Sequence, residues 1–265
     1  MSDDAAVARS AHPARAIALA VLWVAGLVVA VLLYLAVASV LAILTVRVGA
    51  DLLDGIDPFL DQALRPPLGA ARLAGRELGV DILRQIFLAV LVLGTVIWRE
   101  PGTWRRRLAL DRAEPNGMRA RHLLLVLLLW PIFHIVWVTG TAEAFGAAFA
   151  QGVHLSPSLS RTAVAAWLAY VVVLAPAAEE ILMRGEMFAS ARRFLSPAAT
   201  VLVTAGLFSL AHVSAWGFAR PVSLLPLALM LGWLRWRTGR LWPCIALHGW
   251  SNLSLLAYVL WPGPA

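Results

Sequence analysis

The sequence predicts an all-α protein, a polytopic transmembrane helical bundle of about seven spans with its N-terminus inside. Three observations support this prediction. The 265 residues are 61% hydrophobic and only 14% charged, whereas a soluble domain is about 45–50% apolar and about 25% charged. The apolar residues fall into runs that are long enough to cross a bilayer. All 22 basic residues are arginine, and they gather in short segments between these runs.

Seven apolar segments are the expected spans. The first, residues 16–46, is too long for the apolar region of a signal peptide. The others are residues 81–98, 122–139, 161–194, 197–218, 221–236 and 241–261. The segment 161–194 exceeds the ~20 residues that a span needs, so it must tilt, kink near Pro176 or project from the bilayer. Residues 47–79 carry four aspartates and the Pro66-Pro67 pair, which favours an extramembrane loop that could include a short surface helix.

Arginine placement indicates the orientation. Clusters follow the second, fourth and sixth spans, and the positive-inside rule places all of them inside. Their members are Arg99, Arg105, Arg106, Arg107, Arg112, Arg119, Arg121, Arg192, Arg193, Arg235, Arg237 and Arg240. Arg65, Arg72 and Arg76 would then lie outside, against the rule. Because the basic residues flank apolar runs, we expect no nucleic-acid partner. The use of arginine alone is typical of a GC-rich genome, so we expect an integral protein of a bacterial inner membrane.

Ionisable and amide side chains inside three of the apolar runs are the strongest functional signal. In chain order they are Glu179, Glu180, Arg184, His212, His248 and Asn252. A charge at the centre of a membrane helix costs about 2.5–3.5 kcal/mol on insertion scales. Such residues persist where they pair with one another or line a wet cavity. Glu180 and Arg184 share one helix face, as do His248 and Asn252, because each pair is spaced i,i+4. We therefore expect one polar site.

These side chains suit hydrolysis of an amide by an activated water. A glutamate can act as general base, a facing histidine can orient the water, and His248 with Asn252 can donate to a developing oxyanion. Helix geometry does not choose between Glu179 and Glu180 as the base. Zinc is an alternative, held by Glu179, His212 and His248, but the same groups could hold water without a metal. Cys244 is the single cysteine, so no cysteine cluster is available.

The motifs resemble those of the CPBP family, the CAAX-protease and bacteriocin-processing intramembrane peptidases, also called the ABI family. That family has Glu-Glu-x-x-x-Arg, then Phe-x-x-x-His, then His-x-x-x-Asn or Asp on successive membrane helices. Here the motifs are residues 179–184, 208–212 and 248–252, and the resemblance covers about residues 160–255. The residues around the motifs also agree with the family pattern, namely Gly185, Gly232 and the run 238–243. Three ordered motifs are specific, although Glu-Glu-x-x-x-Arg alone is not.

The resemblance implies a role for each site residue. Glu179 would activate water together with His212, while His248 and Asn252 would stabilise the oxyanion. Glu180 and Arg184 would be structural or tuning residues. The implied activity is that of an intramembrane endopeptidase, glutamate-dependent and with no required cofactor. Its partners would be the lipid bilayer and a membrane protein or peptide substrate.

The remaining expectations concern organisation and alternatives. We expect residues 156–265 to form the CPBP-like catalytic core and residues 1–155 to add helices that shape substrate access, all in one compact bundle. Glu186 is expected to be a solvated charge at the inner boundary, and His134 a polar packing residue. Proton-coupled transport is one alternative, because intramembrane carboxylates and histidines also mark transporters, but the sequence has no inverted repeat. A non-catalytic immunity or scaffold protein is the other.

Overall fold

The computed structural model describes residues 13–61, 67–111, 118–146, 155–213 and 217–260, and their regular secondary structure is helical. The all-α prediction is therefore confirmed. The longest helices are α2 (Pro13–Leu53), α3 (Ala70–Arg99), α5 (Ala120–Ala144), α10 (Ala219–Thr238) and α11 (Trp242–Leu260). A broken helix runs through α6 (Arg161–Ala169), η3 (Tyr170–Leu174), α7 (Ala175–Glu180), η4 (Ile181–Met187) and α8 (Phe188–Ala191). The shorter helices are α4 (Trp104–Arg107) and α9 (Pro197–Leu210).

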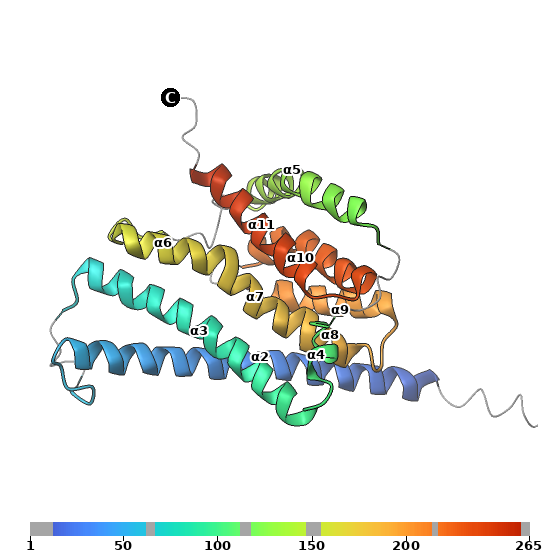
Figure 1. The fold of residues 1–265 in the computed structure, drawn as a ribbon, viewed down its shortest axis with the longest axis horizontal. Helices are drawn as coiled ribbons and strands as arrows, with labels where there is room; N and C mark the ends of the chain where they lie inside the picture. Colours follow the sequence, from blue (N-terminus) through green and yellow to red (C-terminus); the bar gives the residue numbers. More distant parts are fainter. Residues whose placement is uncertain (1–12, 62–66, 112–117, 147–154, 214–216, 261–265) are drawn as a thin grey trace, which may run out of the picture.

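The broken helix lies in the middle of the bundle. In Figure 1, α2 and α3 lie along one side of it, and α5, α10 and α11 lie on the other. One apolar cluster joins α2, α3, η4 and α9, with Val31, Val92, Leu182 and Phe208 among its buried members. Helices from both sides of the expected division at residue 155 thus share one core.

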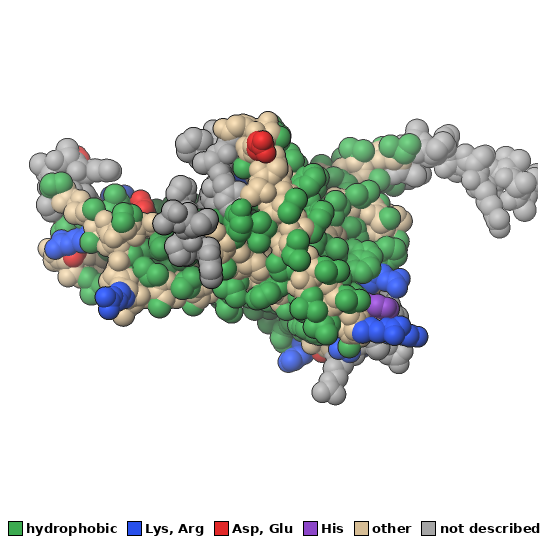
Figure 2. Space-filling view, turned by 90° about the horizontal axis from the view of Figure 1, so that it is seen from above, with side chains coloured by type: hydrophobic (Ala, Val, Ile, Leu, Met, Phe, Trp, Pro, Cys, Tyr) green, Lys and Arg blue, Asp and Glu red, His purple; other side chains and the backbone are tan. Residues whose placement is uncertain are grey.

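The surface of the bundle is suited to lipid. Large apolar side chains are exposed along the helices, such as Leu32 at 60% and Ile132 at 67%, and hydrophobic side chains cover most of one face (Figure 2). Soluble monomers rarely expose contiguous apolar patches of more than a few hundred Å². Four of the described helices are long and apolar enough to cross a membrane, namely residues 17–53, 70–99, 120–144 and 161–191. The chain is therefore an integral membrane protein.

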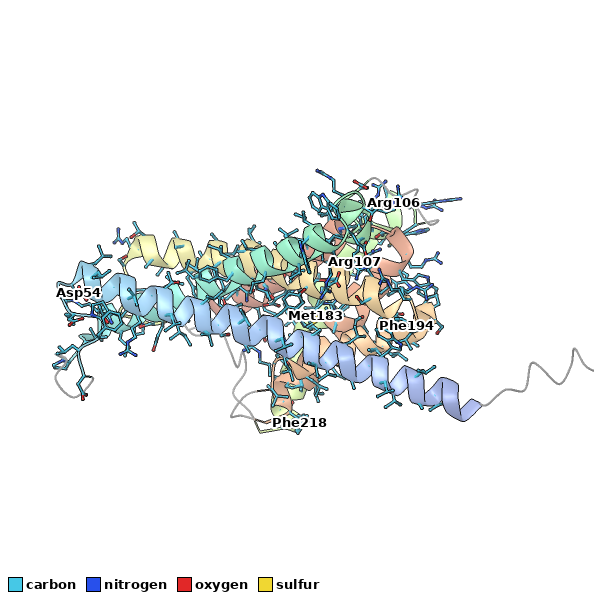
Figure 3. All side chains as sticks on the ribbon, turned by 90° about the horizontal axis from the view of Figure 1, so that it is seen from below. Asp54, Arg106, Arg107, Met183, Phe194 and Phe218 are labelled. Atoms are coloured by element: carbon cyan, nitrogen blue, oxygen red, sulfur yellow. The ribbon has the colours of Figure 1, made fainter. Side chains whose placement is uncertain are left out.

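The count of seven spans and the inside N-terminus stay predictions. Helices occupy all seven expected segments, but α9 has 14 residues, and α10 and α11 fall outside the four that are long and apolar enough. The end of the bundle with Asp54 lies opposite the end with Arg106 and Arg107 (Figure 3). Arg65, Arg112 and the last residue of the seventh segment lie outside the described residues.

The prediction of a long loop at residues 47–79 was wrong at both ends. The helix α2 continues to Leu53, and α3 begins at Ala70. The reason is that the charges of this segment pair across the two helices. Arg76 donates to Asp51, whose side chain is 1% exposed, and to Asp54, both at 3.0 Å. A paired carboxylate can continue a helix into the bundle, where an unpaired one would mark a loop.

Prolines inside α5 and α10 leave backbone carbonyls without a helical partner, since proline lacks an N–H for the carbonyl four residues earlier. Pro131 does this to Leu127, and the carbonyl of Leu127 accepts from the indole N–H of Trp250 in α11 at 2.8 Å. The carbonyl of Val222, four residues before the proline of α10, accepts from Trp137 in α5 at 3.1 Å. Two indoles thus satisfy the backbone and tie α5, α10 and α11 together.

Candidate active site

The broken helix that carries both glutamates contains two π segments, η3 and η4, on either side of α7. Such segments occur often at functional sites. In η3 the N–H of Ala175 bonds the carbonyl five residues earlier, that of Tyr170. The next residue is Pro176, which has no N–H to continue this pattern. The carbonyl of Val171 is therefore left for another donor, and the kink expected near Pro176 is a change of helix type.

The helix α11 packs directly on these open carbonyls. The side-chain amide of Asn252 donates to the carbonyl of Val171 at 2.9 Å. One turn earlier, Gly249 lies so close to η3 that a Cβ atom there would be 2.4 Å from the carbonyl oxygen of Val172. The contact positions His248, which directly precedes Gly249 in the helix. Asn252 therefore has a structural contact in addition to the oxyanion role predicted for it.

Replacing Gly249 with alanine is expected to reduce stability by about 1–3 kcal/mol, as overpacking does. The obstacle is a backbone oxygen, so no rotamer change relieves it. Thermal unfolding in detergent measures the effect. Gly206→Ala is the matched control, because a Cβ in that helix meets nothing within 4 Å. Equal melting temperatures for both variants would contradict the close contact.

The centre of the site is the carboxylate of Glu179. Its Oε2 atom lies 4.0 Å from Nε2 of His212 and 4.0 Å from Nε2 of His248. Its Oε1 atom accepts from the side-chain amide of Gln85 in α3 at 3.2 Å. The side chain of Glu179 is 20% exposed, so a water or substrate can reach it. The structure thus brings Glu179, His212 and His248 together, from α7, the turn after α9, and α11.

Hydrogen bonds set which nitrogen of each imidazole faces Glu179. Nδ1 of His212 lies 2.8 Å from the carbonyl of Phe208, which can only accept, so this nitrogen carries the proton. Nδ1 of His248 lies 2.9 Å from Glu180 Oε1 and donates in the same way. A separation of 4.0 Å is too long for a direct hydrogen bond, but it leaves room for one bridging water. His212 lies in the turn beyond the end of α9 at Leu210.

Glu180 and Arg184 form a sealed ion pair. Both side chains are 0% exposed, and Arg184 Nη1 donates to Glu180 Oε1 at 3.0 Å. The second terminal nitrogen donates to the carbonyl of Ala228 in α10 at 2.8 Å, and the guanidinium lies 4.7 Å from the Phe208 ring centre. Because Glu180 also bonds His248, the pair orients that imidazole. The contrast between a sealed Glu180 and an accessible Glu179 favours Glu179 as the base, a choice that helix geometry left open.

Two other sequence interpretations have an outcome in the structure. His134 is buried against Ser251, whose hydroxyl also accepts from Trp130 at 3.1 Å, which fits a polar packing role. Glu186 was expected to be solvated, and this was wrong, because it is 2% exposed. Arg107 from α4 binds it with two nitrogens, at 2.6 and 2.8 Å. These hydrogen bonds raise the pKa of the Arg107 guanidinium above its ordinary value.

Gln85 is the contact that sequence reasoning missed. It is 5% exposed, and its Oε1 atom is buried without a partner among the described residues. An uncharged amide in the segment 81–98, outside every motif, was a weak signal. A polar amide inside an apolar run could have identified Gln85 as a site residue, because a buried amide requires hydrogen-bond partners.

The donor atoms do not fit a metal as they stand. In the described part of the chain, no group of three or more histidine, cysteine, aspartate or glutamate residues is arranged to hold a metal ion. Tetrahedral zinc with bonds of about 2.0–2.2 Å would bring neighbouring donor atoms to about 3.4 Å. The 4.0 Å separations from Glu179 to the two imidazoles are longer than this.

Comparison with known proteins gives one family match, and it covers the segment that carries the site. Residues 160–254 match a family model described as Type II CAAX prenyl endopeptidase Rce1-like. No curated protein and no solved structure matches the chain. The matched segment runs from the start of α6 into α11 and contains all six predicted site residues, while α2, α3 and α5 lie outside it. Such a match supports an endopeptidase of the CAAX type. Residues 160–254 are thus similar to the CPBP family, which the three sequence motifs also resemble.

Proposed function

We propose that this protein is an intramembrane endopeptidase that hydrolyses a peptide bond of a membrane-associated protein or peptide with a water activated by Glu179. One observation carries the proposal: a partly exposed carboxylate faces two imidazole nitrogens at 4.0 Å each, inside a bundle with a lipid-facing surface. This spacing suits one water that contacts all three groups.

The proposed reaction begins with that water. It donates a hydrogen bond to Glu179 and is oriented by Nε2 of His212. As its oxygen attacks the carbonyl carbon, Glu179 takes its proton. His248, which Glu180 orients through Nδ1, is the proposed donor to the oxyanion. Asn252 gives one amide hydrogen to Val171 and has a second for the same oxygen. Glu179 then passes its proton to the amine nitrogen as the C–N bond breaks.

We propose that this chemistry needs no metal. Activity is expected to survive removal of metals with o-phenanthroline and EDTA, because the carboxylate supplies the base and the imidazoles need no metal to hold the water. Cleavage by the dialysed protein before and after added Zn²⁺ measures this. Loss on chelation with recovery on zinc addition would instead support the alternative site of Glu179, His212 and His248.

Gln85 is proposed as a positioning residue for Glu179, since it binds the carboxylate oxygen that does not face the imidazoles. Gln85→Leu is expected to lower kcat by about 10-fold with little change in KM, since a misplaced base weakens attack and not binding. Gln85→Glu tests the donor, because a carboxylate of the same shape cannot donate when ionised. A variant with normal kcat and a raised KM would contradict the positioning role.

The function is tested by finding new protein termini. Membrane proteins from cells that make the chain are compared, by mass spectrometry of their termini, with those from cells that make the Glu179→Gln variant. Termini that require Glu179 identify the substrate, and the purified pair in liposomes must reproduce the cut. Solute uptake by liposomes without any cleavage would support proton-coupled transport. Neither cleavage nor uptake would support the non-catalytic alternative.

A further inference from the structure

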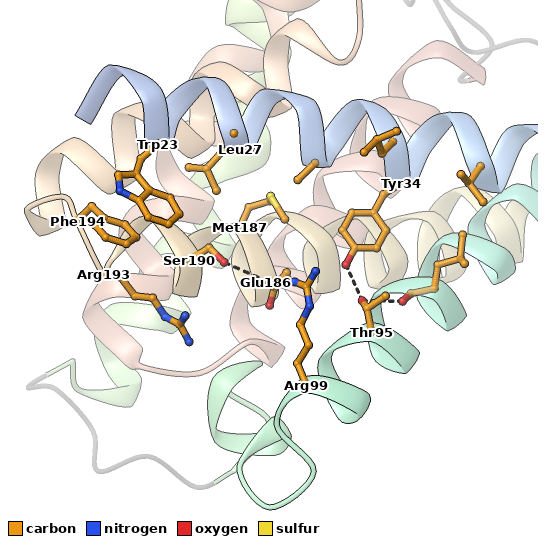
Figure 4. A pocket seen from close by; sticks show the side chains of 15 residues that line it. Trp23, Leu27, Tyr34, Thr95, Arg99, Glu186, Met187, Ser190, Arg193 and Phe194 are labelled. Atoms are coloured by element: carbon orange, nitrogen blue, oxygen red, sulfur yellow. Dashed lines mark hydrogen bonds between the residues drawn. The ribbon is translucent and has the colours of Figure 1, made fainter. Parts of the chain in front are cut away.

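A cavity separate from the catalytic residues lies between α2, α3 and α8 (Figure 4). Its volume is about 460 Å³, within the ~300–1,000 Å³ of small-molecule sites. Most of its wall is apolar, including Leu27, Leu33 and Leu91, while Arg99 and Arg193 line a polar end. The cavity therefore has the character of an amphiphile site, with a long apolar part and a basic end.

The charge at the polar end is not balanced within the protein. Glu186 and Glu100 are both satisfied: Arg107 binds Glu186 with two nitrogens and Glu100 at 2.8 Å, and Arg193 binds Glu100 at 2.8 Å. Two arginines thus offset two carboxylates. Arg99 adds one further positive charge and forms no ion pair with any residue that the structure describes. An anionic group beside Arg99 would complete the balance.

The length of the cavity matches one leaflet of a bilayer. Along α2 its lining runs from Trp23 to Val37, about 21 Å at ~1.5 Å per residue. Half of a hydrocarbon core is about 15 Å, which leaves the remainder for the headgroup region. The ring centres of Trp23 and Phe194 lie 3.7 Å apart in a stack beside the polar end. Aromatic side chains such as tryptophan are enriched at the membrane–water interface. The polar end also falls at the arginine-rich boundary that is expected inside.

We propose that this cavity binds an anionic phospholipid of the inner leaflet, with an acyl chain along α2 and α3 and its phosphate at Arg99. Basic pockets between membrane helices on that side recognise anionic headgroups. The bound lipid would contact α8 and Glu186. Glu186 lies in η4, the segment that directly follows α7 with Glu179. This site is independent of whether the protein hydrolyses peptides.

The test measures lipid binding to the full-length protein. The purified protein in detergent is titrated with phosphatidylglycerol or phosphatidylcholine, and bound lipid is counted by native mass spectrometry. Phosphatidylglycerol is expected to bind more tightly, and Arg99→Gln is expected to weaken it about fivefold. Arg106→Gln is the matched control, since that arginine is exposed on the same basic segment but does not line the cavity. This control is expected to bind as the wild type does.

A second variant tests the apolar part. A Cβ at Gly26 meets nothing within 4 Å, and Gly26 lines the cavity, so Gly26→Leu is expected to occupy cavity space, with a thermal unfolding curve to check that the fold is kept. This variant is expected to bind both phosphatidylglycerol and phosphatidylcholine more weakly than the wild type does. The proposal would be overturned by any of three results. These are equal affinity for the two lipids, an equal loss of phosphatidylglycerol affinity in the Arg99→Gln and Arg106→Gln variants, and unchanged lipid binding in Gly26→Leu. Competition by glycerol phosphate at the affinity of the whole lipid would also overturn it, because a free anion would then suffice.

Discussion

Replacing Glu179 with glutamine is expected to lower kcat/KM for peptide cleavage by about 10²–10⁴-fold, the usual contribution of a general base. Glutamine has nearly the same shape but cannot take the proton of the attacking water. The 20% exposure of this side chain and its contact with Gln85 allow the amide to be accommodated, so the variant is expected to fold. Cleavage of the identified substrate in liposomes, with a thermal unfolding curve for the same preparation, measures both quantities.

Glu143→Gln is the matched control for this prediction. Glu143 is an exposed carboxylate near the end of α5, so its loss is expected to leave cleavage unchanged. His212→Gln is expected to lower activity as well, because it removes the nitrogen that orients the water. Full activity in both Glu179→Gln and His212→Gln would show that the proposed mechanism is wrong.

Replacing Arg184 with methionine is expected to lower the free energy of unfolding by about 3–5 kcal/mol, as breaking a buried ion pair does. The substitution leaves the fully buried carboxylate of Glu180 without its counter-charge and the carbonyl of Ala228 without its donor. Denaturation in mixed micelles measures the loss. Arg72→Met is the control, because the Arg72 side chain is 66% exposed and its 3.8 Å pair with Asp54 is worth at most about 1 kcal/mol.

A double variant separates charge from packing at this pair. Removing both charges, as Glu180→Leu with Arg184→Met, is expected to recover most of the lost stability, since no charge is left buried alone. It is not expected to recover activity, because His248 loses the carboxylate that orients it. An Arg184→Met protein as stable as the Arg72→Met control would refute the assignment of Glu180 as a buried charge.

Patterns along the chain predicted much of the site. Charged and imidazole groups inside apolar runs singled out Glu179, His212 and His248, which the structure brings together. Spacing along the helix did not choose between Glu179 and Glu180 as the base. It could not show which of them is sealed, because that depends on α10 and α11, which supply the partners of Glu180 and Arg184.

The wrong predictions share a physical cause. In each, the environment of a polar residue was predicted without knowledge of the distant residue that pairs with it. Asp51 was placed in an extramembrane loop and Glu186 was taken as solvated, yet each is buried against an arginine from another segment. Gln85 was passed over, although it bonds Glu179 across 94 positions of sequence. Local hydropathy records the cost of placing such a group in apolar surroundings. It does not record the remote group that offsets this cost.

The amino-acid sequence was enough to identify an all-helical membrane protein and the side chains that are too costly to bury without a role. Composition and apolar runs are sums over local residues, so they need no knowledge of contacts. The packing of the helices was needed to show that Glu179 stays accessible while Glu180 is sealed, and that Asn252 bonds the open carbonyl of Val171. It also showed that Arg99 has no acidic partner among the described residues. These outcomes depend on which helices pack together, because burial and hydrogen bonding are properties of contacts between distant segments.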